Sequence, residues 1–173
     1  NAALTIGGAL ADGGSVTLSN ARKVTITSAG DDDGISFTIV GTDINGTAQT
    51  ESLTGADTGV ATSSKFFLTI ASITAVGDPA GNVKAGISAD SSSIVYSGRA
   101  RLKGSFLTST ATAGTIDFLN TSTAGTSLMK ISSVASATAT RDVVIPENGV
   151  LFTDGIYLQY TVSTFLTMTV FHA

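Results

Sequence analysis

Polar and apolar residues alternate along most of this chain, and this alternation restricts its fold more than any other feature. Val24 and Ile26 alternate with polar residues in one segment, and Phe37 and Ile39 do so in the next. Because residues two apart on a strand face the same side, a period of two predicts half-buried β-strands. The Val, Ile and Thr residues that dominate these segments favour strands. Helical spacing is nearly absent, so we expect an all-β fold.

Turn signals divide the first half of the chain into short strands. Gly and Asp residues at 29–34 accept the backbone angles of a tight connection, and predict a hairpin between the strands on either side. The Asn45-Gly46 pair favours a second hairpin with a type I′ turn. We expect a flexible loop at 55–64 and strands at 22–28, 35–40, 47–53, 65–76 and 83–87. This spacing is typical of an immunoglobulin-like β-sandwich.

A polar segment without bulky side chains, residues 89–93, separates two halves of different charge. Residues 1–93 hold four basic and nine acidic residues, whereas residues 94–173 hold five basic and four acidic ones. We therefore expect an immunoglobulin-like domain at 1–88, a linker at 89–93 and a jelly-roll-like sandwich at 94–173. Strands are expected at 94–103, 105–109, 114–120, 127–134, 141–145, 150–152, 156–162 and 167–171. Phe106 and Phe171 are counted among the aromatic residues that should make this second core firm.

The residue types for reaction chemistry are scarce. The chain has no Cys and a single His, His172, next to the last residue. Nucleophilic and acid/base catalysis need an activated group beside a base, so we expect no catalytic residues and no metal or other cofactor. A net charge of −4 argues against nucleic-acid binding. No apolar run is long enough for a membrane helix, no secretory signal is visible, and the lack of Cys fits assembly in a reducing cytoplasm.

Three basic residues form the main candidate for a protein interface. Arg99, Arg101 and Lys103 occupy alternate positions, so one strand covering all three would carry a basic stripe on one face. That stripe could meet an acidic protein surface. The alternative is a solvated sheet face or a charged edge that discourages aggregation.

Acidic residues offer two further hypotheses. The run Asp31 to Asp33 invites a calcium site, but the EF-hand spacing fails, and a solvated hairpin tip is the preferred interpretation. Asp117 with Asp142 or Glu147 could form the carboxylate pair of a glycosidase. Few further residues would support such a site, so an enzyme ranks below a building or binding module. His172 is expected to be a surface or interface residue.

Residues 21–43, reading ARKVTITSAGDDDGISFTIVGTD, resemble a segment of structural proteins of tailed bacteriophages. Asn45-Gly46, Glu51 and the strand at 66–74 continue the likeness, which covers about residues 15–90. Residues 145–152 and 155–158 resemble small sandwich domains of capsid-decorating, head-fibre or tail proteins of marine phages. The resemblance implies a virion structural protein.

These expectations combine into one leading hypothesis. It is a non-enzymatic capsid decoration (cement) protein that assembles in the host cytoplasm, binds the outer capsid surface and stabilises the shell of major capsid subunits. A homotrimer suits the local threefold positions of an icosahedral lattice. The C-terminal half would dock or trimerise and the acidic N-terminal half would project outward. The alternative is a tail or head-fibre component that binds a host surface glycan or protein.

Overall fold

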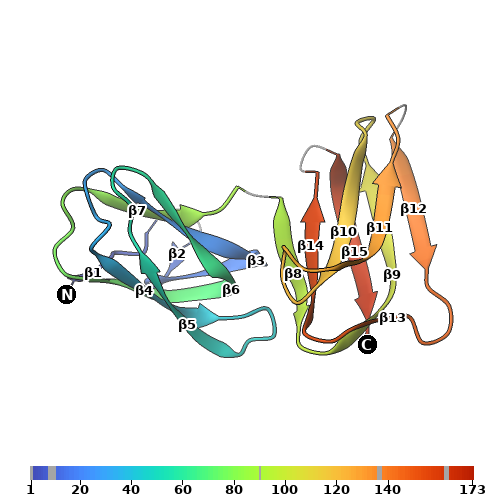
Figure 1. Ribbon diagram of the computed structural model, residues 1–173, viewed down its shortest axis with the longest axis horizontal. Coiled ribbons are helices and arrows are strands. Elements are labelled where there is room, and N and C mark those ends of the chain that lie inside the picture. The colour runs from blue at the N-terminus through green and yellow to red at the C-terminus, as the bar shows by residue number, and fades with distance from the viewer. Residues whose placement is uncertain (1, 8–10, 90, 136–137, 162–163) are drawn as a thin grey trace. The chain divides into compact units, whose positions relative to one another are not determined.

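All helices and strands that the structure describes in this chain are β-strands, joined by turns and loops. The computed structural model describes residues 2–7, 11–89, 91–135, 138–161 and 164–173. These residues hold fifteen strands and no helix (Figure 1), which confirms the all-β class. They form two compact units, Asn1–Ala89 and Asp90–Ala173. The immunoglobulin-like and jelly-roll descriptions stay predictions, as does the independence of two domains.

The first unit is one hydrogen-bonded sheet of seven strands. Its strand order is β2-β3-β6-β4-β5, and β1 pairs with β6 while β7 pairs with β3. The strands are β1 (Ala2–Ala3), β2 (Ala11–Asp12), β3 (Ser15–Ser28), β4 (Ser36–Thr42), β5 (Ala48–Thr54), β6 (Val60–Val76) and β7 (Val83–Ile87).

Two long strands allow this single sheet to enclose a core. The register of β3 against β6 shifts between Thr17 and Arg22 and again between Lys23 and Thr25. Such irregularities increase the local bend of a strand. The buried core of this unit includes Val24, Ile26, Phe37, Ile39, Phe67, Ile70 and Ile73.

The predicted hairpin between 22–28 and 35–40 is wrong. β3 and β4 do not pair with each other, because both pair with β6. β3 pairs mainly with the first half of β6, and β4 pairs with the second half. Residues 60–64 also belong to β6, so the predicted loop at 55–64 ends earlier than expected. Both errors have the same cause. β6 is distant in sequence from β3 and β4, and pairing between distant strands leaves no local signal.

The hairpin at Asn45-Gly46 is confirmed, since β4 and β5 pair in continuous register from Ser36 to Thr42. Its predicted type I′ turn is wrong. That turn needs positive φ at both central residues, but of the pair only Gly46 has it, at 81°. The Asp43 carboxylate closes the loop instead, accepting hydrogen bonds from the N–H groups of Asn45 and Thr47, both at 2.9 Å.

The second unit is a sandwich of two four-stranded sheets. One has the order β11-β10-β14-β8, and in the other β9 pairs with β12, β13 and β15. The strands are β8 (Ser92–Ser97), β9 (Ala100–Ser109), β10 (Gly114–Asn120), β11 (Ser127–Ser133), β12 (Ala139–Val144), β13 (Val150–Phe152), β14 (Gly155–Tyr160) and β15 (Phe165–His172). Leu102 and Leu107 from β9 pack in one core with Ile116 and Phe118 from β10.

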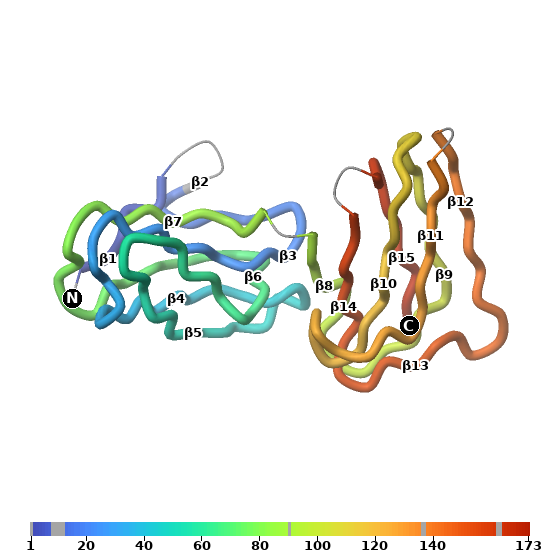
Figure 2. The backbone as a smooth tube through the Cα atoms, turned by 45° about the horizontal axis from the view of Figure 1, so that its top comes forward, coloured from blue at the N-terminus to red at the C-terminus, as the bar shows by residue number. Residues whose placement is uncertain are grey.

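Strand β9 is the centre of its sheet. β12 pairs with residues 104–109 of β9 and β13 with residues 100–102, and the chain swings outward between them at 145–149 (Figure 2). β15 also pairs with β9, along residues 102–109. The predicted strand at 94–103 is therefore wrong, because Gly98, with φ of 108°, turns the chain between β8 and β9.

Candidate protein-binding face

An irregularity in β9 changes which side chains face outward. Gly104 lies opposite Phe171 of β15 and Leu102 lies opposite His172, so Lys103 is an extra residue in the ladder. This is the arrangement of a β-bulge, which reverses the alternation beyond it. Leu102 and Leu107 face the core, whereas Phe106 faces outward and is 40% exposed. The expectation that Phe106 belongs to the core is wrong for this reason.

The exposed face around Gly104 is apolar at its centre. Register places Gly104 between Val144 of β12 and Phe171 of β15, which are 77% and 51% exposed. A hollow of about 560 Å³ lies beside Gly104, and Phe106 forms part of its lining. We call Phe106, Val144 and Phe171 with this hollow the docking patch. Phe171, like Phe106, was expected in the core and is exposed.

Charged groups of both signs border the docking patch. Lys103 and Asp142 line the same hollow, and Asp142 lies opposite Phe106 in the ladder between β12 and β9. An apolar centre with a charged rim is typical of surfaces that bind other proteins.

The basic stripe is only partly as predicted. Arg101 and Lys103 lie on β9, but Arg99 lies in the turn before it, so no single strand carries all three. Arg101 donates a hydrogen bond to the Asn148 carbonyl and Lys103 donates one to the Glu147 carbonyl, each at 3.1 Å. The two side chains therefore hold the loop between β12 and β13. Their role in binding a partner stays a prediction.

The acidic run at 31–33 is not a uniformly solvated tip. Asp32 is fully buried, and its Oδ1 accepts a hydrogen bond from the Ala80 N–H at 2.7 Å. Its Oδ2 is buried without a hydrogen-bond partner. Asp32 therefore fastens the loop before β7 to the loop before β4. Among the described residues, no group of three Asp, Glu, His or Cys side chains is placed to hold a metal ion.

Replacing Asp32 should separate its hydrogen bond from its charge. Asp32→Ala leaves the Ala80 N–H without its charged acceptor in a partly buried hydrogen bond, which should lower the free energy of unfolding by about 1–3 kcal/mol. Asp32→Asn keeps an oxygen for that N–H, and its loss should be smaller. Urea unfolding measures both. An equal loss in the two variants would contradict the assigned role of the hydrogen bond.

Of the two proposed carboxylate pairs, that of Asp117 with Asp142 is not assembled, and that of Asp117 with Glu147 stays untested. Asp117 lies on β10 and Asp142 on β12, which belong to different sheets. Their neighbours Ile116 and Val143 pack into the shared core, so both carboxylates point away from it on opposite faces of the sandwich. Asp117 instead forms an ion pair with Lys130 at 3.3 Å and accepts a hydrogen bond from the Ser127 hydroxyl at 2.8 Å.

His172, next to the last residue, lies beside an aromatic ring. His172 is exposed, and its ring centroid lies 5.0 Å from that of Tyr96 on β8. Burial raises the pKa of Tyr157 on β14, and the nearby negative charge of Asp154 adds to this rise.

In the described part of the chain, no helix is long and apolar enough to cross a membrane.

Comparison with known proteins gives no matching family model, no similar curated protein and no similar solved structure.

The sequence did not predict the docking patch, although one signal for it exists. An isolated glycine within a strand pattern, here Gly104, is typical of a bulge. A bulge at that position would have placed Phe106 outside.

Proposed function

We propose that this chain is a structural protein of a tailed-phage virion that binds the outer capsid surface as a decoration protein. The observation that carries the proposal is the docking patch, where two aromatic side chains and Val144 stand exposed around a hollow. Exposed apolar clusters of this kind mark surfaces for protein binding, and aromatic residues are enriched there. The likeness of residues 21–43 and 145–152 to phage structural proteins gives the partner, the major capsid protein.

The distribution of charge supports docking through the second unit. Residues 94–173 have a net charge of +1, whereas residues 1–93 have a net charge of −5. A nearly neutral unit with an apolar patch is desolvated at lower cost than a strongly acidic one. The N-terminal unit would therefore project from the shell. Three copies around a local threefold axis would repeat the same patch over the lattice.

Variants of the docking patch should lose capsid binding. Phe106→Ser with Phe171→Ser removes both aromatic groups, and aromatic hot spots contribute about 2 kcal/mol or more, which is about a thirtyfold loss of affinity. The control is Val134→Ser, an equally polar change at an exposed valine of the same unit outside the patch. Co-sedimentation with capsids that lack the protein measures binding. Undiminished binding by the double variant would exclude the patch as the docking surface.

The same two aromatic side chains also favour a second function. Exposed Phe106 and Phe171 could stack against a sugar or a host surface protein, as in a tail or head-fibre component used in adhesion. Binding to host cells that is abolished by removing surface glycans, together with no binding to capsids, would favour adhesion over decoration.

A further inference from the structure

Strand β7 has one edge that no described strand covers. It pairs with β3, and hydrogen bonds from Ser88 to Lys23 and from Ala29 to Asn82 mark the two ends of that ladder. Bonded and non-bonded pairs alternate in an antiparallel ladder, so Lys84 and Gly86 are the residues bonded to β3. The backbone N–H and C=O groups of Val83, Ala85 and Ile87 therefore point toward the uncovered edge.

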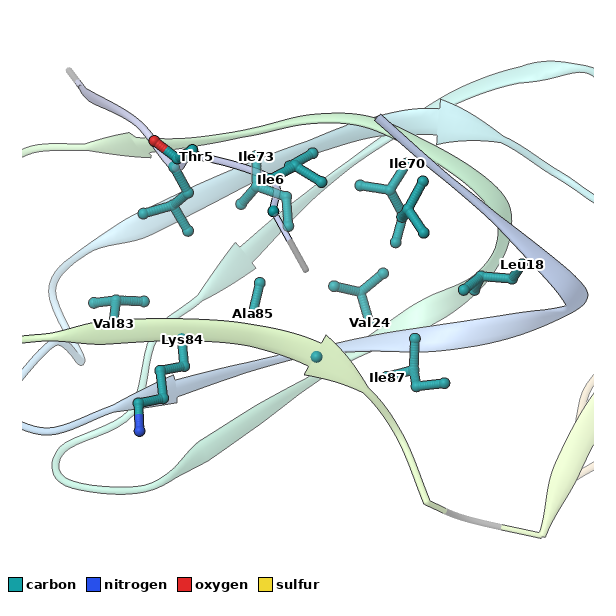
Figure 3. A pocket seen from close by; sticks show the side chains of 14 residues that line it. Thr5, Ile6, Leu18, Val24, Ile70, Ile73, Val83, Lys84, Ala85 and Ile87 are labelled. Atoms are coloured by element: carbon teal, nitrogen blue, oxygen red, sulfur yellow. The ribbon is translucent and has the colours of Figure 1, made fainter. Parts of the chain in front are cut away.

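An apolar hollow lies directly beside this edge. It has a volume of about 510 Å³, and its walls come from β7, from the core strands and from the N-terminal segment that carries Leu4 and Ile6. Val83 and Ala85 point into it while Lys84 points away (Figure 3). Ile87 is 45% exposed at its border. Among the described residues, no strand covers the backbone groups of this edge, and the side chain of Ile87 stays exposed.

Elsewhere in the same sheet, side chains hold some backbone groups of β5 and β6. Beside β5, the Glu51 carboxylate accepts hydrogen bonds from the N–H groups of Ser64 and Lys65, at 2.7 and 2.9 Å. Lys65 also donates to the Thr50 carbonyl at 2.8 Å. On β7 no proline or register shift interrupts residues 83–87. Such interruptions are two of the usual protections of an edge strand, and a charged residue is a third, which on β7 is Lys84 alone.

We propose that β7 pairs with β7 of a second copy of this chain, antiparallel and centred on Ala85. The edge groups belong to residues 83, 85 and 87, which are symmetric about Ala85, so a twofold axis there matches every donor with an acceptor. On the outer face Lys84 lies opposite Gly86 of the second copy, so two lysines are never directly opposed, a contact that would repel. The pairing joins two sheets and places the two apolar hollows side by side.

A single introduced thiol tests the register, because the chain has no cysteine of its own. In Ala85→Cys the two thiols belong to a directly opposed bonded pair, about 5.5 Å apart at Cα, which lies within disulfide range. In the control Lys84→Cys the equivalent residues are diagonal neighbours at about 7–8 Å, beyond that range. Under mild oxidation, we expect covalent dimers to form at least about tenfold faster in Ala85→Cys. Equal rates, or no dimer in either variant, would overturn the proposal.

A proline variant tests the pairing without a thiol. Ala85→Pro removes only an N–H that points to the uncovered edge, a position where edge strands tolerate proline. Sedimentation velocity should show concentration-dependent dimers for the natural sequence and their loss in this variant, with the unfolding temperature kept near that of the natural sequence. Equal dimer formation by the folded variant would contradict the proposal. This pairing goes beyond the proposed function, so its failure would leave the docking patch untouched.

Discussion

Phe118→Ala is expected to lower the free energy of unfolding of the second unit by about 3–5 kcal/mol, measured by urea unfolding. Phe118 is fully buried on β10, where it lies between Met129 of β11 and Leu158 of β14. Removing its ring leaves a cavity that neighbouring strands cannot fill. The free energy of unfolding of a folded protein is only about 5–15 kcal/mol, so this loss is a large share of the total.

Leu166→Ala is the matched control for this variant. Leu166 lies on β15 of the same unit and is 63% exposed, so its truncation should change stability by less than about 0.5 kcal/mol. Hydrogen exchange adds a test of the two units. If they unfold separately, Phe118→Ala should weaken protection in β9 and β10 and leave β4 and β6 unchanged. A loss below about 1 kcal/mol would contradict the position of Phe118 in the core.

Gly41→Ala is expected to destabilise the first unit by about 3 kcal/mol, toward the upper end for overpacking. A methyl group at Gly41 would lie 1.9 Å from the Thr69 carbonyl oxygen, so β4 and β6 would have to separate. The pairing of β4 with β6 shifts register at this glycine. The Thr69 carbonyl belongs to the backbone of the central strand β6. Displacing it would disturb the packing on both sides of β6.

Gly46→Ala, in the loop that follows β4, separates this clash from backbone conformation. Gly46 has a φ of 81° and open space around it, so alanine there should cost only about 1–2 kcal/mol from the left-handed conformation. Thermal unfolding of both variants compares the two effects. If Gly41→Ala lost no more stability than Gly46→Ala, this result would contradict the close approach of β4 to β6.

The sequence predicted individual strands better than their pairing. The strands at 83–87, 114–120 and 150–152 have the predicted bounds, because turn residues delimit a short alternating segment. The β4–β5 hairpin is also local and was predicted. The pairing of β3 and β4 with β6 depends on contacts between distant residues, which no local pattern records.

The candidate site was predicted even less completely. Residues 101 and 103 do share the outer face of β9, as their spacing indicated. The bulge at Lys103 then reverses the alternation, so an uninterrupted period of two assigns Phe106 to the wrong side. The hollow depends on the positions of Val144 and Phe171 on either side of Gly104. These positions follow only from the register of three strands, β12, β9 and β15. Only the glycine itself was a signal in the sequence.

The two proposed contacts use different parts of the chain. The docking patch belongs to the second unit and the uncovered edge of β7 to the first, so one contact can form without the other. A closed lattice with local threefold axes also contains twofold relations between neighbouring threefold positions. Edge pairing through β7 could therefore link copies that dock separately.

The most direct test of the proposed decoration function is the copy number of this chain in purified phage particles, measured by quantitative mass spectrometry against the major capsid protein. A decoration protein repeats over the shell, so the account predicts a fixed simple ratio to the capsid subunits, and selective stripping of the chain should leave tails intact. A few copies per particle that remain with isolated tails or fibres would contradict decoration and assign the protein to adhesion.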